Sequence, residues 1–320
     1  MTTTLRDTFL PFVRPDYIEG MIIGDDLDSL LSALYLHRRY GWPVLGCYCR
    51  YSRLWHVGPR ETFLRQFGRG QLVAVDLDIY HPAVPSIGHH ILRLSDADGD
   101  LVGHTHSFNP NNLRGLSIQR GFRRKYPLAT IHLLLCLFQE KKLAPEVELL
   151  VWLADSAFIN AQQYQDNVTE WVNGYLQFPA FVEKLPALQT LAFEATLKEK
   201  ILDRMAIHPL CRPLLKSGYR SRHLGLNGFQ CQWDDPVRQQ SEIQSLLQLL
   251  SDLTGWPMLP LSDWAATSFA GGQIVGRRNE MPVADLLATR LSFSEWLDRE
   301  SVFSYAFTFR DRLNFTVIDF

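Results

Sequence analysis

Short apolar runs in the first half of the chain alternate with segments whose apolar residues recur at helical spacing. The strand-like runs lie at residues 17–24, 42–48 and 71–75. The helix-like segments lie at residues 28–39, 61–67 and 129–142. Strands that alternate with helices predict a mostly parallel sheet covered on both faces, and strands made almost entirely of apolar residues fit such a sheet. We therefore expect an α/β fold, with a mostly parallel sheet flanked by helices.

The second half of the chain has a different pattern. Residues 160–204 show helical spacing, with many Gln, Glu and Lys between apolar residues, and residues 241–253 form a clear amphipathic pattern. Residues 305–320 alternate as two strands would, with a turn near Asp311. We expect a first domain over residues 1–175, a helical connector over 176–235 and a small C-terminal α+β domain over 236–320. Residues 147–153 fit a strand or a helix equally well.

Composition excludes several classes of protein. The 320 residues carry 34 acidic and 32 basic side chains, so the chain is not a globally basic nucleic-acid binder, although a local basic groove remains open. The 19 Phe, 11 Tyr and 8 Trp exclude intrinsic disorder. No apolar stretch approaches the roughly 20 residues that cross a bilayer, and the N-terminus lacks the apolar stretch of a secretory signal. Five cysteines without a CxxC pair indicate reduced thiols in a cytoplasmic protein.

Acidic residues and histidines follow the apolar runs of the first half. Asp25, Asp26 and Asp28 follow the first run, and Asp76 ends the third. Ligand sites of such sheets lie at the carboxyl ends of the strands, so we expect chemistry here. The bland alternative for Asp28 is that it caps the helix that follows.

Two further segments add to this set. His89 and His90 are adjacent between apolar residues, and Asp155 follows the apolar residues 147–153. Carboxylates with one or two imidazoles suit Mn²⁺ or Mg²⁺. Two such ions could hold a bridging water and stabilise the attacking and leaving oxygens in phosphate-ester hydrolysis.

In their order along the chain, these segments resemble the motifs of the DHH phosphoesterase superfamily, and within it the RecJ-like single-strand exonuclease branch. Residues 24–32 (GDDLDSLLS) resemble the first motif, D-x-D-G-x-x-S. Val75-Asp76 is similar to the second, Gly88-His89-His90 to the Asp-His-His signature and Leu153-Ala154-Asp155-Ser156 to the fourth. Residues 107–112 (SFNPNN) resemble the Asn-Pro segment that follows the signature. The resemblance covers about residues 18–170 and implies that the first domain is a metal-binding phosphoesterase domain.

The resemblance implies roles for individual residues. Its metal ligands would be Asp26, Asp28, Asp76, His89 and Asp155, holding one or two Mn²⁺ or Mg²⁺ ions. Asp76 would bridge two metals, and His90 would face the scissile phosphate, so these two residues are the catalytic candidates. Asn109 and Asn111 of the Asn-Pro segment are expected to contact the substrate, and so, from the basic composition of their segment and not from the resemblance, are Arg114, Arg123 and Arg124.

Basic residues support a phosphate-containing substrate. Residues 101–139 and 204–233 contain no acidic side chain, and both windows carry several arginines. Such segments could line a groove that follows phosphates while aromatic side chains stack on bases, although a solvated basic face is an equally good interpretation. Gly271-Gly272 faintly resembles the glycine-rich substrate-binding stretch of the RecJ-like branch and is at least as typical of an ordinary turn.

Three departures from the family pattern leave an alternative open. Ser29 stands at the position of the usual Gly, and Gly88 stands at the position of the Asp that supports the neighbouring His. An upstream ligand of the first motif is not evident. The leading hypothesis is a metal-dependent phosphodiesterase acting on single-stranded nucleic acid or small nucleotides, without a membrane partner. The alternative is a degenerate, non-catalytic DHH-fold scaffold or nucleic-acid-binding component.

Overall fold

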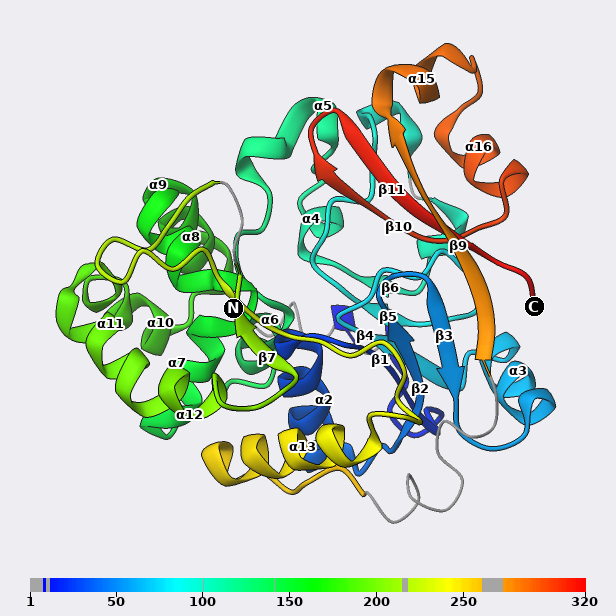
Figure 1. Cartoon of the computed structure of the whole chain (residues 1–320). Coiled ribbons are helices and arrows are strands. Elements are labelled where there is room, and N and C mark those ends of the chain that lie inside the picture. The colour runs from blue at the N-terminus through cyan, green and yellow to red at the C-terminus, as the bar shows by residue number, and fades with distance from the viewer. Residues whose placement is uncertain (1–7, 10–11, 100, 141, 215–217, 261–272) are drawn as a thin grey trace.

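The fold is built around one nine-stranded sheet (Figure 1). The computed structural model describes residues 8–9, 12–99, 101–140, 142–214, 218–260 and 273–320. The order of the strands is β10-β11-β9-β3-β2-β1-β4-β5-β6. Five of them, β2-β1-β4-β5-β6, run parallel, and β3 adds an antiparallel strand beside β2. This confirms the predicted α/β fold with a mostly parallel sheet.

The predicted strands form the centre of this sheet. They are β1 (Gly20–Gly24), β2 (Val44–Cys49) and β4 (Leu72–Val75). Four other strands of this sheet were not predicted: β3 (Arg53–His56), β5 (Ser86–Ile87), β6 (Ser107–Phe108) and β9 (Gln273–Pro282). Two-residue strands such as β5 and β6 are too short to show a period of two, so only their pairing in the sheet reveals them.

Helices cover both faces of the parallel part, as predicted. Side chains of β1 alternate between two cores: Met21 and Ile23 pack with one group of helices, and Ile22 packs on the other face. The first face is covered by α2 (Leu27–Tyr40), α6 (Thr130–Leu137), α7 (Pro145–Leu153) and α13 (Gln240–Thr254). The second face carries α3 (Arg60–Gly68), through Phe63 and Phe67. The segment at residues 147–153 is therefore a helix.

The middle of the chain is helical, as the sequence predicts (green in Figure 1). It contains α8 (Ala157–Gln163), α9 (Gln165–Thr169), α10 (Pro179–Lys184), α11 (Leu191–Leu197) and α12 (Asp203–Met205). Two π-helical turns, Glu170–Leu176 and Lys198–Leu202, continue α9 and α11. A separate two-stranded sheet of β7 (Cys211–Pro213) and β8 (Phe229–Cys231) follows.

The C-terminal part is a small α+β unit whose sheet is continuous with the central one. The predicted hairpin is β10 (Val302–Phe309) and β11 (Arg312–Ile318). The long strand β9 (Gln273–Pro282) pairs with β11 along most of its length and with β3 at its beginning. Helices α15 (Val283–Ala288) and α16 (Phe293–Arg299) complete the unit. The domain boundaries at residues 175 and 235 stay a prediction.

Shorter elements connect the sheet to the helices. They include α4 (Pro110–Leu113), α5 (Ile118–Gly121) and the 3₁₀ turns Asp96–Asp98, Val102–His104, Phe122–Arg124, Ala154–Ser156 and Ala187–Gln189. All five cysteines are buried and free, and their reduced state in the cell stays a prediction. Among the described helices, none has the length and apolar character needed to cross a bilayer. Gly271 and Gly272 lie outside the described residues.

Candidate metal centre

The candidate residues lie where their supporting elements end. Asp26 and Asp28 follow β1, and Asp76 follows β4 directly. His89 lies two residues after β5, and Asp155 lies in the 3₁₀ turn after α7. Because β1, β4 and β5 are parallel neighbours, their carboxyl ends meet at one edge of the sheet. The structure thus brings together segments up to 129 positions apart, from Asp26 to Asp155.

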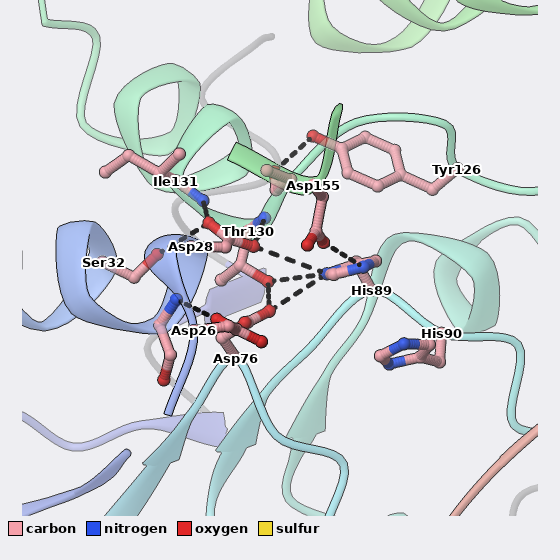
Figure 2. A network of polar contacts seen from close by, with 12 residues as sticks. Asp26, Asp28, Ser32, Asp76, His89, His90, Tyr126, Thr130, Ile131 and Asp155 are labelled. Atoms are coloured by element: carbon pink, nitrogen blue, oxygen red, sulfur yellow. Dashed lines mark hydrogen bonds and ion pairs between the residues drawn. The ribbon is translucent and has the colours of Figure 1, made fainter. Parts of the chain in front are cut away.

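Four of these residues form a compact cluster around His89 (Figure 2). One ligand atom each of Asp28, Asp76, His89 and Asp155 lies within 4.8 Å of the others. His89 Nδ1 is 3.1 Å from Asp76 Oδ1 and 3.8 Å from Asp28 Oδ2, and its Nε2 is 2.9 Å from Asp155 Oδ2. The fifth predicted ligand, Asp26, is outside this set of four, although Figure 2 shows its carboxylate beside that of Asp76.

The two carboxylates of the first motif serve two different helices. Asp26, not Asp28, is the N-cap of α2, and it accepts a hydrogen bond of 2.9 Å from the backbone N–H of Ser29. Asp28 is fully buried and accepts the backbone N–H groups of Thr130 and Ile131 at 2.6 and 2.9 Å. These two groups begin α6, whose N-cap residue offers no side-chain hydrogen bond. The alternative that Asp28 caps α2 is wrong, because the strand turns into the helix two residues earlier.

Thr130 is a member of the site that sequence reasoning missed. Its hydroxyl donates to Asp76 Oδ1 at 2.7 Å and lies 3.0 Å from His89 Nδ1. With its backbone N–H on Asp28, it contacts three residues of the cluster. The only sequence signal was its place at the start of the predicted helix 129–142, and a threonine there is common in any protein.

Ser29 links the two central strands at the same edge. Its hydroxyl accepts the N–H of Gly24 at 2.6 Å and donates to the carbonyl of Val75 at 3.1 Å. These residues end β1 and β4, just before Asp25 and Asp76. Ser29, at a position where the resemblance leads us to expect glycine, therefore gives the strand ends an additional connection.

Burial and mutual repulsion dominate the electrostatics of the cluster. Burial, followed by the charge of Asp155, raises the pKa of Asp26 to about 6. The pKa values of Asp28 and Asp76 also rise, first through burial and then through the charges of Asp76 and Asp26, respectively. Burial opposes protonation of His89, but the carboxylates of Asp155 and Asp28 outweigh it and raise its pKa to about 9. Burial likewise opposes ionisation of Asp155, but His89 lowers its pKa.

Two of the candidate ligands have a backbone conformation that non-glycine residues rarely adopt. The φ angles of Asp76 and Asp155 are 57° and 49°, and Ser156 follows with 59°. Left-handed conformations of this kind cost on the order of 1–3 kcal/mol each and gather at functional sites, where surrounding contacts maintain them. The strain lies at two of the carboxylates that converge on His89.

His90 lies beside the cluster and is held by a different carboxylate. Its ring stacks on that of His89 with centroids 4.5 Å apart, and its side chain is 38% exposed. Its Nδ1 is 3.1 Å from Asp78 Oδ2. Burial opposes ionisation of Asp78, but the hydrogen bond and charge of His90 lower its pKa. The sequence shows Asp78 two residues after Asp76 but does not indicate which histidine it contacts.

The predicted substrate residues fall into two groups. Asn109 and Asn111 are fully buried and donate hydrogen bonds to the carbonyls of His90 and His89, at 2.9 and 2.6 Å. Arg114 stacks over Tyr175, 3.7 Å from the ring centroid, and is ion-paired with Glu170.

Arg123 and Arg124 are the exposed members of this set, and Arg124 is also ion-paired with Glu170, at 2.6 Å. Contact of all five residues with a substrate stays a prediction.

Comparisons of the chain with models of protein families, with curated proteins and with solved structures found no match. What the structure shares with the expected superfamily is coarse: a mostly parallel sheet with flanking helices and a buried cluster of Asp and His.

Proposed function

We propose that this protein is a metal-dependent phosphoesterase that hydrolyses phosphodiester bonds, with single-stranded nucleic acid or small nucleotides as substrates. One observation supports the proposal above the others. Four separated segments bring Asp28, Asp76, Asp155 and His89 within ligand distance of one another at the carboxyl edge of a parallel sheet. A scaffold would gain nothing from this arrangement, because carboxylates gathered at one point repel each other unless a cation neutralises them.

The donor set fits a hard divalent cation. Carboxylate oxygens with one imidazole suit Mn²⁺ or Mg²⁺ better than a soft metal, and no cysteine belongs to the cluster. Among the described residues, no lysine or arginine is ion-paired with Asp28, Asp76 or Asp155. The raised pKa values of Asp26, Asp28 and Asp76 agree with this: burial and neighbouring carboxylates disfavour their ionised forms, and a bound cation would stabilise those forms.

The residues of the chain would divide the work of hydrolysis as follows. Asp28, Asp76, His89 and Asp155, with Asp26 beside them, would hold one or two ions. A bound ion would supply the positive charge that polarises a phosphoryl oxygen and lowers the pKa of water.

His90 would act on the phosphate itself. Its imidazole is accessible next to the cluster, so it would hydrogen-bond to a non-bridging oxygen or give a proton to the leaving oxygen. Arg123 and Arg124, both exposed, would attract the phosphate backbone.

A Mn²⁺ titration followed by calorimetry, with turnover of a chromogenic phosphodiester measured in parallel, tests the proposal. We expect at least one Mn²⁺ per chain and hydrolysis that a chelator abolishes. Binding without turnover on phosphodiesters would favour the non-catalytic scaffold over the enzyme. The absence of any binding would contradict the metal centre as well.

The affinity for Mn²⁺ is expected to rise with pH between about 6 and 9. Metal ligands must be deprotonated, and in the metal-free protein the pKa of Asp26 is about 6 and that of His89 about 9. Protons therefore compete with the metal most strongly at low pH, and binding releases them into solution.

Calorimetry in two buffers of different ionisation enthalpy counts these protons. In a His89→Asn variant the increase above pH 7 should flatten, while the increase near pH 6 remains. An affinity of the original protein that does not change between pH 6 and 9 would contradict the assignment of His89 as a ligand.

A further inference from the structure

Asp78 lies two residues after Asp76 but takes no part in the metal cluster. It is 5% exposed, and both of its oxygens accept hydrogen bonds. Oδ2 accepts the backbone N–H of His90 at 3.3 Å and lies 3.1 Å from its Nδ1, and Oδ1 accepts a hydrogen of the Asn109 amide at 3.0 Å. The hydrogen bonds of this buried carboxylate thus go to His90 and to the amide of Asn109.

His90 is fixed at three atoms by this pair. Asp78 engages its backbone nitrogen and its Nδ1, and Asn109 donates to its backbone oxygen at 2.9 Å. A carboxylate on Nδ1 keeps a hydrogen there, so a neutral His90 has the lone pair on Nε2, on the opposite side of the ring. No described residue engages this Nε2, so it remains available to a ligand.

The space around Gly88 shows that the carboxylate of Asp78 is built into the site. A Cβ atom on Gly88 would lie 2.2 Å from Asp78 Oδ1 and 2.6 Å from its Oδ2, far inside contact distance. Position 88 is therefore limited to glycine for a steric reason, because the carboxylate of Asp78 occupies the volume that a side chain there would need.

We infer that Asp78 is the positioning residue of His90: it keeps a hydrogen on Nδ1 and fixes the orientation of the imidazole, so that Nε2 is the nitrogen that takes up a proton from water and donates it to the phosphate oxygen. Asn109 assists from the other side of the carboxylate. The inference rests on the proposed phosphoesterase function, and it adds to the site a carboxylate that acts through His90 and not through the metal.

Asp78→Asn tests the role of the carboxylate. An amide offers one acceptor in place of two, so it cannot accept from both His90 and Asn109, and Nδ1 loses its fixed hydrogen. We expect kcat to fall about ten- to hundredfold, the loss typical of residues that orient a functional group. KM and the affinity for Mn²⁺ should change less than about threefold, since the substitution leaves the metal cluster intact.

The tautomer of His90 gives a readout that does not depend on activity. ¹⁵N NMR of the metal-free protein at alkaline pH should show a protonated Nδ1 and an unprotonated Nε2 for His90. In Asp78→Asn we expect a shift toward the opposite tautomer. The matched control is Asp96→Asn, because Asp96 is an exposed carboxylate that also accepts two hydrogen bonds, from Ser117 and Arg120.

Gly88→Ala tests the space that the carboxylate occupies. The added methyl group should lower the melting temperature by roughly 5 °C through overpacking. In an Asp78→Ala background, where the clashing atoms are gone, the same methyl group should cost less stability than it does in the original protein, while turnover stays low. A cost of Gly88→Ala that is equal in the two backgrounds would contradict the steric relation.

The outcomes separate the positioning role from the proposed function. A wild-type His90 with its hydrogen on Nε2, or an Asp78→Asn variant with unchanged tautomer and kcat, would overturn the inference. If the wild-type protein hydrolyses no phosphodiester but the tautomer depends on Asp78, the positioning of His90 stands and the phosphoesterase proposal fails. Because the wild-type spectrum alone decides the tautomer, the test does not depend on the folding of a variant.

Discussion

Replacing Asp76 by asparagine is expected to lower phosphodiester turnover by about a thousandfold. A bound metal contributes several kcal/mol of transition-state stabilisation. About 1.4 kcal/mol corresponds to a tenfold change in rate, so the loss of part of this stabilisation lowers turnover by several factors of ten. Asp76 contacts His89 at 3.1 Å and the Thr130 hydroxyl at 2.7 Å, and its carboxylate lies beside that of Asp26. Asparagine keeps the acceptor for Thr130 and tolerates the left-handed backbone of this position, so the variant removes chiefly the charge.

The same variant is expected to be more stable than the original protein in metal-free buffer. Burial and the charge of Asp26 raise the pKa of Asp76, which means that its ionised form destabilises the folded state. The gain in melting temperature should be present near neutral pH and vanish below about pH 4, where the carboxyl group is protonated in the folded and the unfolded chain. Differential scanning calorimetry over this pH range measures it.

A variant of the neighbouring carboxylate and a surface control make the result for Asp76 specific. Asp26→Asn removes a neighbouring charge but keeps the N-cap of α2, because asparagine caps as well as aspartate. Asp252→Asn changes an exposed carboxylate of α13 and should alter neither turnover nor stability. Turnover of Asp76→Asn at the level of Asp252→Asn would point to a different active site or to a contaminating nuclease.

The second large effect is expected at Glu194, in the helical middle region. Its carboxylate is fully buried and accepts the Gln162 amide at 2.9 Å and the backbone N–H of Leu224 at 2.7 Å. It also accepts the N–H of His223 at 3.2 Å, so one side chain ties the segment after residue 220 to α8 and α11. Glu194→Ala would leave these donors buried without an acceptor, and we expect the free energy of unfolding to fall by about 3 kcal/mol.

Urea unfolding with a matched surface variant measures this loss. Glu183 is exposed on α10, so Glu183→Ala should change stability by less than about 0.5 kcal/mol. Burial opposes ionisation of Glu194, but the N–H of Leu224 and the Gln162 amide lower its pKa. The stability that Glu194 contributes is therefore present above its ordinary pKa and is lost as the pH falls, so the difference between the two proteins should shrink in acid. A difference that is small at neutral pH would contradict the structural role.

The sequence predicted the central strands and helices well because their signals are local. The apolar run ending at Gly24 became β1, and the run ending at Val75 became β4. The alternation at the end of the chain became the hairpin of β10 and β11. Strand β9 could not be predicted in the same way, because its position depends on pairing with β3 and β11, which lie more than two hundred residues apart in the chain.

The candidate site was predicted in part, for a related reason. Asp28, Asp76, His89 and Asp155 could be named from their places after apolar runs, and they do converge. Thr130 and Asp78 could not, because a threonine at a helix start and a second aspartate after a strand are common in any sequence. Their contacts with Asp76 and His90 exist only once the helix and the loop have been packed against the strand ends.

By itself, the sequence determined the alternation of strands and helices and the order of the acidic residues and histidines, since period and polarity are properties of neighbouring residues. Only the tertiary structure decided that Asp28 binds the beginning of α6, that Thr130 contacts Asp76, and that the carboxylate beside His90 comes from Asp78. These features join residues that are distant in sequence. The order of the strands and the packing of helices on them bring such residues together, and no local pattern encodes that order.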